Sequence, residues 1–218
     1  MSTFGVPITD ETLEAMSRYA GKRISQVDRA REAMRLIHAE GKNLDALQHA
    51  LGLKASYGDG VSAMVLVYNA TGAALELVDG EGGTMDWYGY VYHEQPPASF
   101  QNGQWLAFLH AHPTAQSIGC EAARVFRGRD VDGQVRDFMV AWSLPWSATQ
   151  NSAYTEVREK DHFPNYWGYI KEEKLEKAGK ICTDQTDKNC ASTVSVGGCT
   201  SSEFIAVLQH KFGPLPEQ

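Results

Sequence analysis

The feature that most constrains the fold is a series of short strand-like segments that begins at Val61 and is interrupted repeatedly by turn residues. Clusters of Gly, Pro, Asn and Asp separate seven segments rich in β-branched and aromatic residues: VSAMVLVYNATG, AALELVDG, WYGYVYH, QWLAFLHAH, CEAARVFRG, VRDFMVAW and AYTEVRE. A charged helical stretch, roughly 169–178, leads to two more such segments, ASTVSVGG and EFIAVLQHKF. This spacing is typical of a largely antiparallel sandwich or barrel, so we expect a mainly β fold.

Helical patterns precede the strands. Thr9 or Asp10 can cap a first helix, Ser25 a second, and Asn43 a third, short helical turn. In the second, apolar residues recur at three- and four-residue spacing on one face, namely Val27, Ala30, Met34 and Ile37. The third turn carries Leu44, Leu47 and Leu51.

The chain shows no linker between its helical and strand-like parts. A length of 218 residues corresponds to one or at most two domains. We therefore expect residues 1–218 to form a single domain, in which helices over 1–55 pack on a β-sandwich over 60–212, with one further helix after residue 165.

Composition and charge exclude several classes of partner. A net charge of −7 disfavours binding to nucleic acid or to anionic lipid, because both require a surplus of Lys and Arg, so any membrane partner should be zwitterionic. The sequence has neither a secretory signal pattern nor eighteen consecutive apolar residues. We expect cytoplasmic synthesis, no transmembrane segment, and contact with an outer leaflet only after unconventional release or cell lysis.

The residues that could carry metal or covalent chemistry do not form a recognised pattern. His110 and His112 fall on one face of a predicted strand, but a third ligand at a diagnostic spacing is missing. Four cysteines lack paired zinc spacing, and Cys182 with Cys190 is the one plausible disulfide under oxidation. There is no nucleophile elbow, P-loop or dinucleotide fingerprint. We expect no catalytic residues, no metal and no cofactor.

Aromatic residues concentrate in one part of the chain. Eight of the 32 residues over 138–169 are aromatic, against 10% overall: Phe138, Trp142, Trp146, Tyr154, Phe163, Tyr166, Trp167 and Tyr169. Strand alternation places Trp142 on a buried face. The strand pattern stops after Pro145 and again around Pro164, which leaves Trp146, Phe163, Tyr166 and Trp167 near a loop end.

Exposed Trp and Tyr rings at a loop end have several physical uses. They settle at the headgroup level of a bilayer, and their π-faces attract quaternary ammonium groups. Together with the acidic net charge, this favours a phosphocholine lipid. A carbohydrate or protein ligand would use the same rings, and simple core packing is a further alternative.

The segments VYNATG, QNGQWLAFLH, GCEAARVFRG, FMVAWSLPWSATQNSAYTEVRE and FPNYWGY resemble the actinoporin-like superfamily of membrane-binding β-sandwich proteins, over about 61–170. Nearly the whole chain, from DRAREA at 28–33 to DHFPNYW, resembles the 23 kDa jasmonate-induced protein family. One member of that family is a non-toxic protein that binds membranes containing sphingomyelin together with cholesterol. The likeness implies the same peripheral partner on an outer leaflet; a lectin-like or stress-associated interaction module is the alternative.

The actinoporin resemblance implies a set of site residues. The run Ser143-Leu-Pro-Trp146 matches a Ser-x-Pro-aromatic motif at a phosphocholine pocket, where Ser143 would donate a hydrogen bond to phosphate. Asn165-Tyr166-Trp167-Gly168 matches a later Tyr-rich motif. The implied headgroup-binding residues are Ser143, Pro145, Tyr154 and Tyr166, and the implied membrane-interface residues are Trp146, Phe163 and Trp167.

Departures from the family pattern modify this expectation. His162 or Phe163 stands where that later motif begins with another aromatic, and Gln150-Asn151 replaces a Trp-Tyr pair, so the headgroup cage should be incomplete. This leaves room for recognition of a lipid arrangement, such as sphingomyelin beside sterol. Residues 1–50 contain seven Lys or Arg and seven Asp or Glu, which makes insertion of the N-terminal helices into a bilayer costly. We expect binding without pore formation.

Overall fold

The computed structural model describes residues 2–113, 116–147 and 150–212; residues 1 and 213–218 of the expected domain lie outside this part. A seven-stranded sheet contains β1 (Thr3–Phe4), β2 (Ser62–Ala70), β5 (Tyr90–Val91), β7 (Trp105–Ala111), β11 (Ile181–Asp184), β12 (Cys190–Val196) and β13 (Ser201–His210). Its strand order is β1–β7–β2–β13–β12–β11, with β5 also paired to β7.

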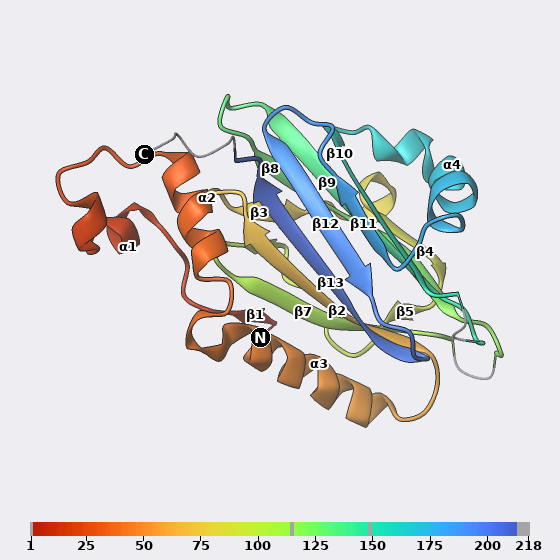
Figure 1. Ribbon diagram of the computed structural model, residues 1–218. Coiled ribbons are helices and arrows are strands. Elements are labelled where there is room, and N and C mark those ends of the chain that lie inside the picture. The colour runs from red at the N-terminus through yellow and green to blue at the C-terminus, as the bar shows by residue number, and fades with distance from the viewer. Residues whose placement is uncertain (1, 114–115, 148–149, 213–218) are drawn as a thin grey trace.

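A six-stranded sheet faces the first (Figure 1). It contains β3 (Leu75–Leu77), β4 (Thr84–Tyr88), β6 (Ser99–Phe100), β8 (Cys120–Arg129), β9 (Val135–Leu144) and β10 (Ser152–Glu159). Its strand order is β10–β9–β8–β3–β6, with β4 also paired to β8. All pairs of described strands are antiparallel except β2 with β13, so the predicted β-sandwich is confirmed.

The core between the sheets follows the two-residue alternation of the strands. On β9, Phe138, Val140 and Trp142 point inward and are almost completely buried. The Trp142 ring packs against Phe108 and Phe204 from the opposite sheet. Trp142 is therefore a core residue, as its strand position predicts.

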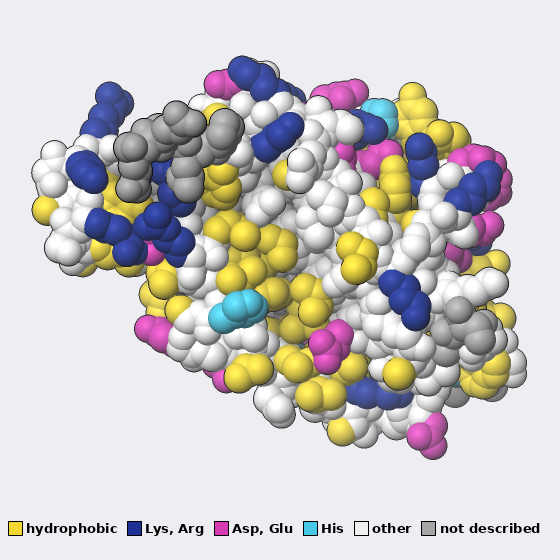
Figure 2. All heavy atoms as spheres, viewed as in Figure 1, with side chains coloured by type: hydrophobic (Ala, Val, Ile, Leu, Met, Phe, Trp, Pro, Cys, Tyr) yellow, Lys and Arg dark blue, Asp and Glu magenta, His cyan; other side chains and the backbone are white. Residues whose placement is uncertain are grey.

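Helices pack on part of the outer face of the seven-stranded sheet, over β7 and β2 and at one end of β13 (Figure 1). They are α1 (Asp10–Glu14), η1 (Ser17–Tyr19), α2 (Gln26–Arg35), η2 (Ala39–Gly41) and α3 (Lys42–Tyr57). Thr9 caps α1 and Ser25 caps α2, each in a capping box, which confirms both predicted helix starts. Hydrophobic side chains visible over this face in Figure 2 lie beside the helices, where β13 contributes the half-buried Ile205 and Val207.

The third helical element, α3, is longer than the short turn expected after Asn43. The helix begins at Lys42 rather than after an Asn43 cap, and Leu44 and Leu51 are 58% and 39% exposed. The residues that face the sheet are Ala46, Ala50 and Leu53. The small side chains of Ala46 and Ala50 allow the helix to lie close to β2 and β7, and Leu47 packs beside them.

A second helical layer covers the outer face of the six-stranded sheet. It consists of η3 (Gly80–Gly82), η4 (Phe163–Asn165), α4 (Trp167–Tyr169) and the π-helical η5 (Ile170–Leu175). Its apolar side chains pack on Ala123, Val125, Met139 and Ala141 of β8 and β9. The helix predicted after residue 165 is confirmed.

The disulfide considered between Cys182 and Cys190 does not fit the register of the strands. Cys182 on β11 pairs with Val194 on β12, whereas Cys190 lies four residues away along β12. That offset corresponds to roughly 13 Å at the usual rise per residue, well beyond the span of a disulfide. Both side chains are free thiols, and so are the other two cysteines.

Lys42 places a charge inside the helical layer. The residue is only 5% exposed, and its Nζ donates hydrogen bonds to the Tyr68 hydroxyl at 3.1 Å and to the Gly103 carbonyl at 2.8 Å. Burial lowers the pKa of Lys42 from 10.5 to about 8. The protonated ammonium therefore costs free energy in the folded state.

The pH dependence of stability should report this burial. Between pH 8 and 10.5 the folded chain releases the Lys42 proton while the unfolded chain keeps it. We expect the free energy of unfolding of the wild type to rise over this range, relative to Lys42→Met, by about 1–3 kcal/mol. Urea denaturation at several pH values measures the difference, with the exposed Lys22→Met as control. A difference that stays constant with pH would contradict the burial of the charge.

Candidate functional site

Three of the predicted site residues meet at one end of the sandwich. Ser143, Pro145 and Trp146 follow one another at the end of β9 and line a pocket of about 330 Å³. Trp146 is 47% exposed at this pocket. Tyr88, Ser117 and Glu121 add further polar groups to the wall of the pocket.

The pairing of adjacent strands positions the polar residues of this wall. Glu121 on β8 pairs with Ser143 on β9 and with Tyr88 on β4, so the three residues form a row across adjacent strands. The pairing of β4 with β8 shifts between Asp86 and Tyr88, which is a β-bulge. A bulge re-aims the side chain that follows it, and here it brings Tyr88 beside Glu121.

An ion pair lies against this row. Lys171 of η5 places its Nζ 3.5 Å from Glu121 Oε2 and 4.5 Å from the centre of the Tyr88 ring. Burial raises the pKa of Glu121, although Lys171 and a hydrogen bond from Ser143 act in the opposite direction. Burial alone would lower the pKa of Lys171, but Glu121 and Tyr88 raise it above its usual value. The wall thus combines a carboxylate, a hydroxyl and a π-face, and the Lys171 ammonium contacts the carboxylate and the π-face from outside the pocket lining.

The exposed Trp146 has a rigid support. Its ring lies edge-on to His112 with ring centroids 5.3 Å apart. His112 is buried, and its backbone carbonyl accepts a hydrogen bond from the Tyr57 hydroxyl at 3.1 Å. Trp146 is therefore held at the rim rather than buried in the core.

His110 on β7 and His112 just after it are not arranged as metal ligands. The Trp142 indole N–H donates to His110 Nδ1 at 3.1 Å, which makes Nδ1 the acceptor. His110 Nε2 then faces Asp86 Oδ1 at 3.1 Å, and burial lowers the pKa of this imidazole. Over 2–113, 116–147 and 150–212, no group of three His, Cys, Asp or Glu residues could hold a metal ion.

The prediction that Phe163 and Trp167 are exposed at a loop end is wrong. Phe163 is completely buried and Trp167 is 7% exposed. The Trp167 indole donates to the Glu81 carbonyl at 3.1 Å, and its ring packs edge-on against Trp87. After Pro164 the chain folds back over β8 and β9, and these rings fill the interface it makes with the sheet. As placed, neither ring can act as a membrane-interface residue.

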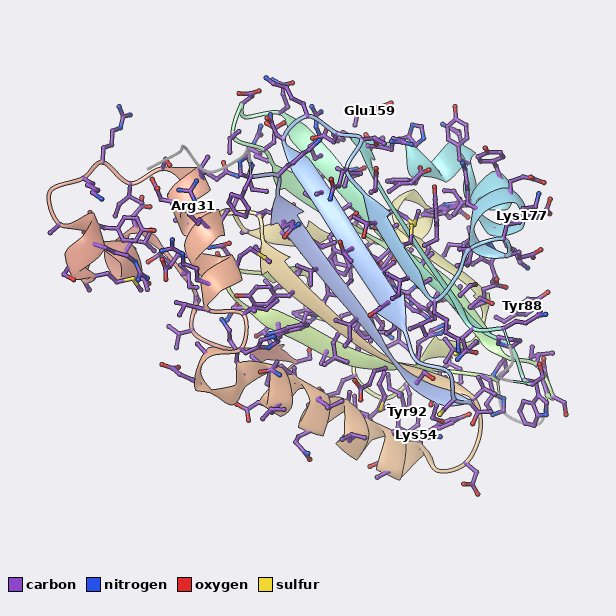
Figure 3. The ribbon with its side chains drawn as sticks, in the orientation of Figure 1. Arg31, Lys54, Tyr88, Tyr92, Glu159 and Lys177 are labelled. Atoms are coloured by element: carbon purple, nitrogen blue, oxygen red, sulfur yellow. The ribbon has the colours of Figure 1, made fainter. Side chains whose placement is uncertain are left out.

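The remaining two predicted residues lie outside the pocket wall. Tyr166 is 46% exposed and stacks on His162 with ring centroids 4.5 Å apart. His162 contacts Glu159, whose strand partner is Arg136, seven residues from Ser143. Figure 3 accordingly shows Glu159 and Tyr88 at opposite ends of the sheet. Tyr154 is half-buried, and its hydroxyl donates to Glu156.

Sequence reasoning missed Tyr88, Glu121 and Lys171. One signal was present for Tyr88: Trp87-Tyr88-Gly89 places two aromatic residues in succession before a glycine, which breaks strand alternation and is typical of a bulge. No local pattern distinguishes Glu121 or Lys171 from other charged residues, because they meet only through the packing of η5 on the sheet.

Mutations should separate the buried aromatic residues from the exposed one. Phe163→Ala should lower the free energy of unfolding by about 3–5 kcal/mol, because it leaves a cavity beneath η4. Trp146→Ala should lower it by less than about 1 kcal/mol, because half of this side chain already contacts water. Urea denaturation measures both values. Equal losses from the two substitutions would contradict the burial described here.

No helix in the described part of the chain is both long and apolar enough to cross a membrane.

Comparisons with known proteins agree on the relatives of this chain. The sequence profile of the family described as "Nakanori-like protein" matches residues 4–211. The chain is 37% identical to the 23 kDa jasmonate-induced protein of Hordeum vulgare over 212 residues, covering 96% of this chain and 98% of that protein. It is 24% identical over 181 residues to a jasmonate-induced protein homolog of Atriplex canescens, covering 81% and 94%.

A solved structure has the same fold. The crystal structure of the lipid binding protein Nakanori superposes with a TM-score of 0.81 at 24% identity, covering 95% of this chain and 99% of that one.

Proposed function

Because this chain belongs to the Nakanori-like family, we propose that it is a peripheral lipid-binding protein whose headgroup site is the pocket lined by Ser143, Pro145 and Trp146. A family relative of known structure is described as a lipid binding protein. The observation that carries the proposal is a rigidly supported, half-exposed Trp146 beside a pocket with both polar and aromatic walls. The proposed activity is binding, with no catalytic step.

The chemistry of the pocket suits a zwitterionic phosphocholine headgroup. A quaternary ammonium group is attracted to the π-faces of Tyr88 and Trp146, and to the carboxylate of Glu121. The Ser143 hydroxyl, which donates to Glu121 in the ligand-free protein, can turn to donate its one hydrogen bond to phosphate instead. The net charge of −7 disfavours anionic lipids. A volume of about 330 Å³ lies within the usual range for small-molecule sites.

We further propose that the membrane recognised is sphingomyelin together with cholesterol. Trp146 can remove roughly 100 Å² from water on insertion, which corresponds to only ~2–3 kcal/mol. Phe163 and Trp167 are buried, so their rings add nothing to the free energy of membrane binding at the pocket end. A site of this strength favours membranes in which headgroups are presented at high density and in a fixed arrangement. In this proposal the protein meets such an outer leaflet after release from the producing cell.

The N-terminal helices support binding without pore formation. Leu13, Ala46 and Ala50 are completely buried between the helices and the sheet. Glu32, also completely buried, pairs with Arg18. Detaching the helices would expose this apolar interface, and insertion would carry several charges into hydrocarbon at about 2.5–3.5 kcal/mol each.

Vesicle binding tests the site. Trp146→Ala should reduce the fraction of protein that sediments with sphingomyelin/cholesterol vesicles at least tenfold, because the main apolar contact is lost. Tyr166→Ala is the matched control: Tyr166 is equally exposed but lies outside the pocket, so binding should persist. Vesicles without cholesterol, and vesicles without phosphocholine lipids, test the specificity. Loss of binding in Tyr166→Ala but not in Trp146→Ala would refute the proposed pocket.

Dye-loaded vesicles test the absence of pores. At protein concentrations that saturate sphingomyelin/cholesterol vesicles, we expect dye release to stay at the level of protein-free vesicles, because the charged helices remain on the sheet. Release at stoichiometric protein would contradict this part of the proposal.

A further inference from the structure

The ion pair beside the pocket has the geometry of a bound ammonium ligand. The Lys171 ammonium lies 4.5 Å from the centre of the Tyr88 ring and 3.5 Å from a carboxylate oxygen of Glu121. An aromatic face together with a carboxylate is the arrangement that recognises quaternary ammonium groups. Tyr88 and Glu121 both line the pocket, so a ligand that enters it reaches the same two groups.

We propose that Lys171 is an internal occupant of this ammonium site, and that the trimethylammonium group of a ligand binds by displacing it from Tyr88 and Glu121. This inference rests on the proposed function. It assigns the ligand's cation to Tyr88 and Glu121, and it makes Lys171 a built-in competitor that keeps the site closed to free choline-like cations.

The charge of Glu121 favours replacement of the Lys171 ammonium by the ligand's ammonium over the departure of Lys171 alone. The Glu121 side chain is only 8% exposed, so removing Lys171 without replacement would leave a nearly buried carboxylate without a counter-ion. An incoming ammonium restores the pairing, and the net charge of the wall is unchanged. A ligand without a positive charge cannot make this exchange.

The Lys171 side chain can move more freely than Tyr88 and Glu121, as displacement requires. Tyr88 and Glu121 are held by β4 and β8, whereas Lys171 reaches them from η5 through a flexible four-carbon stem. The Lys171 side chain is 20% exposed, and Tyr88 is 45% exposed. Lys171 can therefore turn into solvent while the aromatic face and the carboxylate stay in place.

A second lysine on the same helical stretch provides an internal comparison. Lys174 Nζ lies 5.5 Å from the centre of the Tyr169 ring, but no carboxylate pairs with it there within the described residues, and neither residue lines the pocket. The Lys171 arrangement thus differs from an ordinary lysine–tyrosine surface contact by its nearly buried carboxylate, and because both partners of Lys171, Tyr88 and Glu121, line the pocket.

Tetramethylammonium titration tests the inference without a membrane. The methyl NMR signal of the probe shifts when it binds against an aromatic ring. We expect Lys171→Met to bind tetramethylammonium about tenfold more tightly than the wild type, because the competing ammonium is gone. Lys174→Met is the matched control and should bind like the wild type. Lys171→Gln provides a second neutral variant if Lys171→Met is not folded by its thermal transition.

Double variants identify the residues that account for the tighter binding of tetramethylammonium by Lys171→Met. Glu121→Gln or Tyr88→Ala, each added to Lys171→Met, should return tetramethylammonium binding to the wild-type level. Binding to Lys171→Met should also weaken as the pH falls, because burial raises the pKa of Glu121 and its protonation removes the carboxylate charge. Unchanged or weaker binding in both neutral Lys171 variants would overturn the inference.

The vesicle experiment tests the proposed function, and the tetramethylammonium experiment tests the role of Lys171, so either proposal can be refuted without the other. If the wild type sediments with phosphocholine vesicles but removal of Lys171 gives no gain for tetramethylammonium, the proposed function stands and the internal-competitor role is wrong. If the gain is seen but no variant sediments with vesicles, the ammonium site stands and the lipid-binding proposal is wrong.

Discussion

The ladder between β8 and β9 is the constraint on which the rest of the structure depends. Its ten consecutive pairs run from Cys120 opposite Leu144 to Arg129 opposite Val135. Because side chains alternate, this one register sends Trp142 into the core and presents Ser143 beside Glu121 on the outer face. A slip of one residue would exchange these faces, so the core and the pocket wall are specified by the same hydrogen bonds.

The outer face of this ladder links packing to the site. Phe163 and Trp167 fill the interface between the sheet and the segment over 163–175. That packing fixes where η5 lies, and η5 carries Lys171 to Glu121 and Tyr88. The two aromatic rings thus contribute to the site indirectly: they hold a helix in place instead of touching a ligand.

The opposite helical layer serves a different purpose. The apolar side chains of α1, α2 and α3 pack on part of the other sheet. This layer also buries two charged groups with specific partners, those of Glu32 and Lys42. Buried charges with specific partners are costly to move, so this layer resists detachment. The part that interacts with membranes in our proposal is therefore the loop end of the β-sandwich, where the helical layer contributes only the C-terminal end of α3, through Tyr57.

Sequence alone determined the parts of this protein that depend on local periodicity. Alternation and turn residues were sufficient for the β-sandwich and the burial of Trp142, and capping residues located the starts of α1 and α2. Ser143, Pro145 and Trp146 were implied as site residues by a family resemblance, and they line one pocket. Only the tertiary structure decided which stripe of α3 meets the sheet, that Phe163 and Trp167 are buried, and that Tyr88 and Glu121 line the pocket with Lys171 against them. The physical reason is that an aromatic residue after a proline has the same local pattern whether its segment projects into water or folds back on a sheet. The choice rests on contacts with residues far away in the chain.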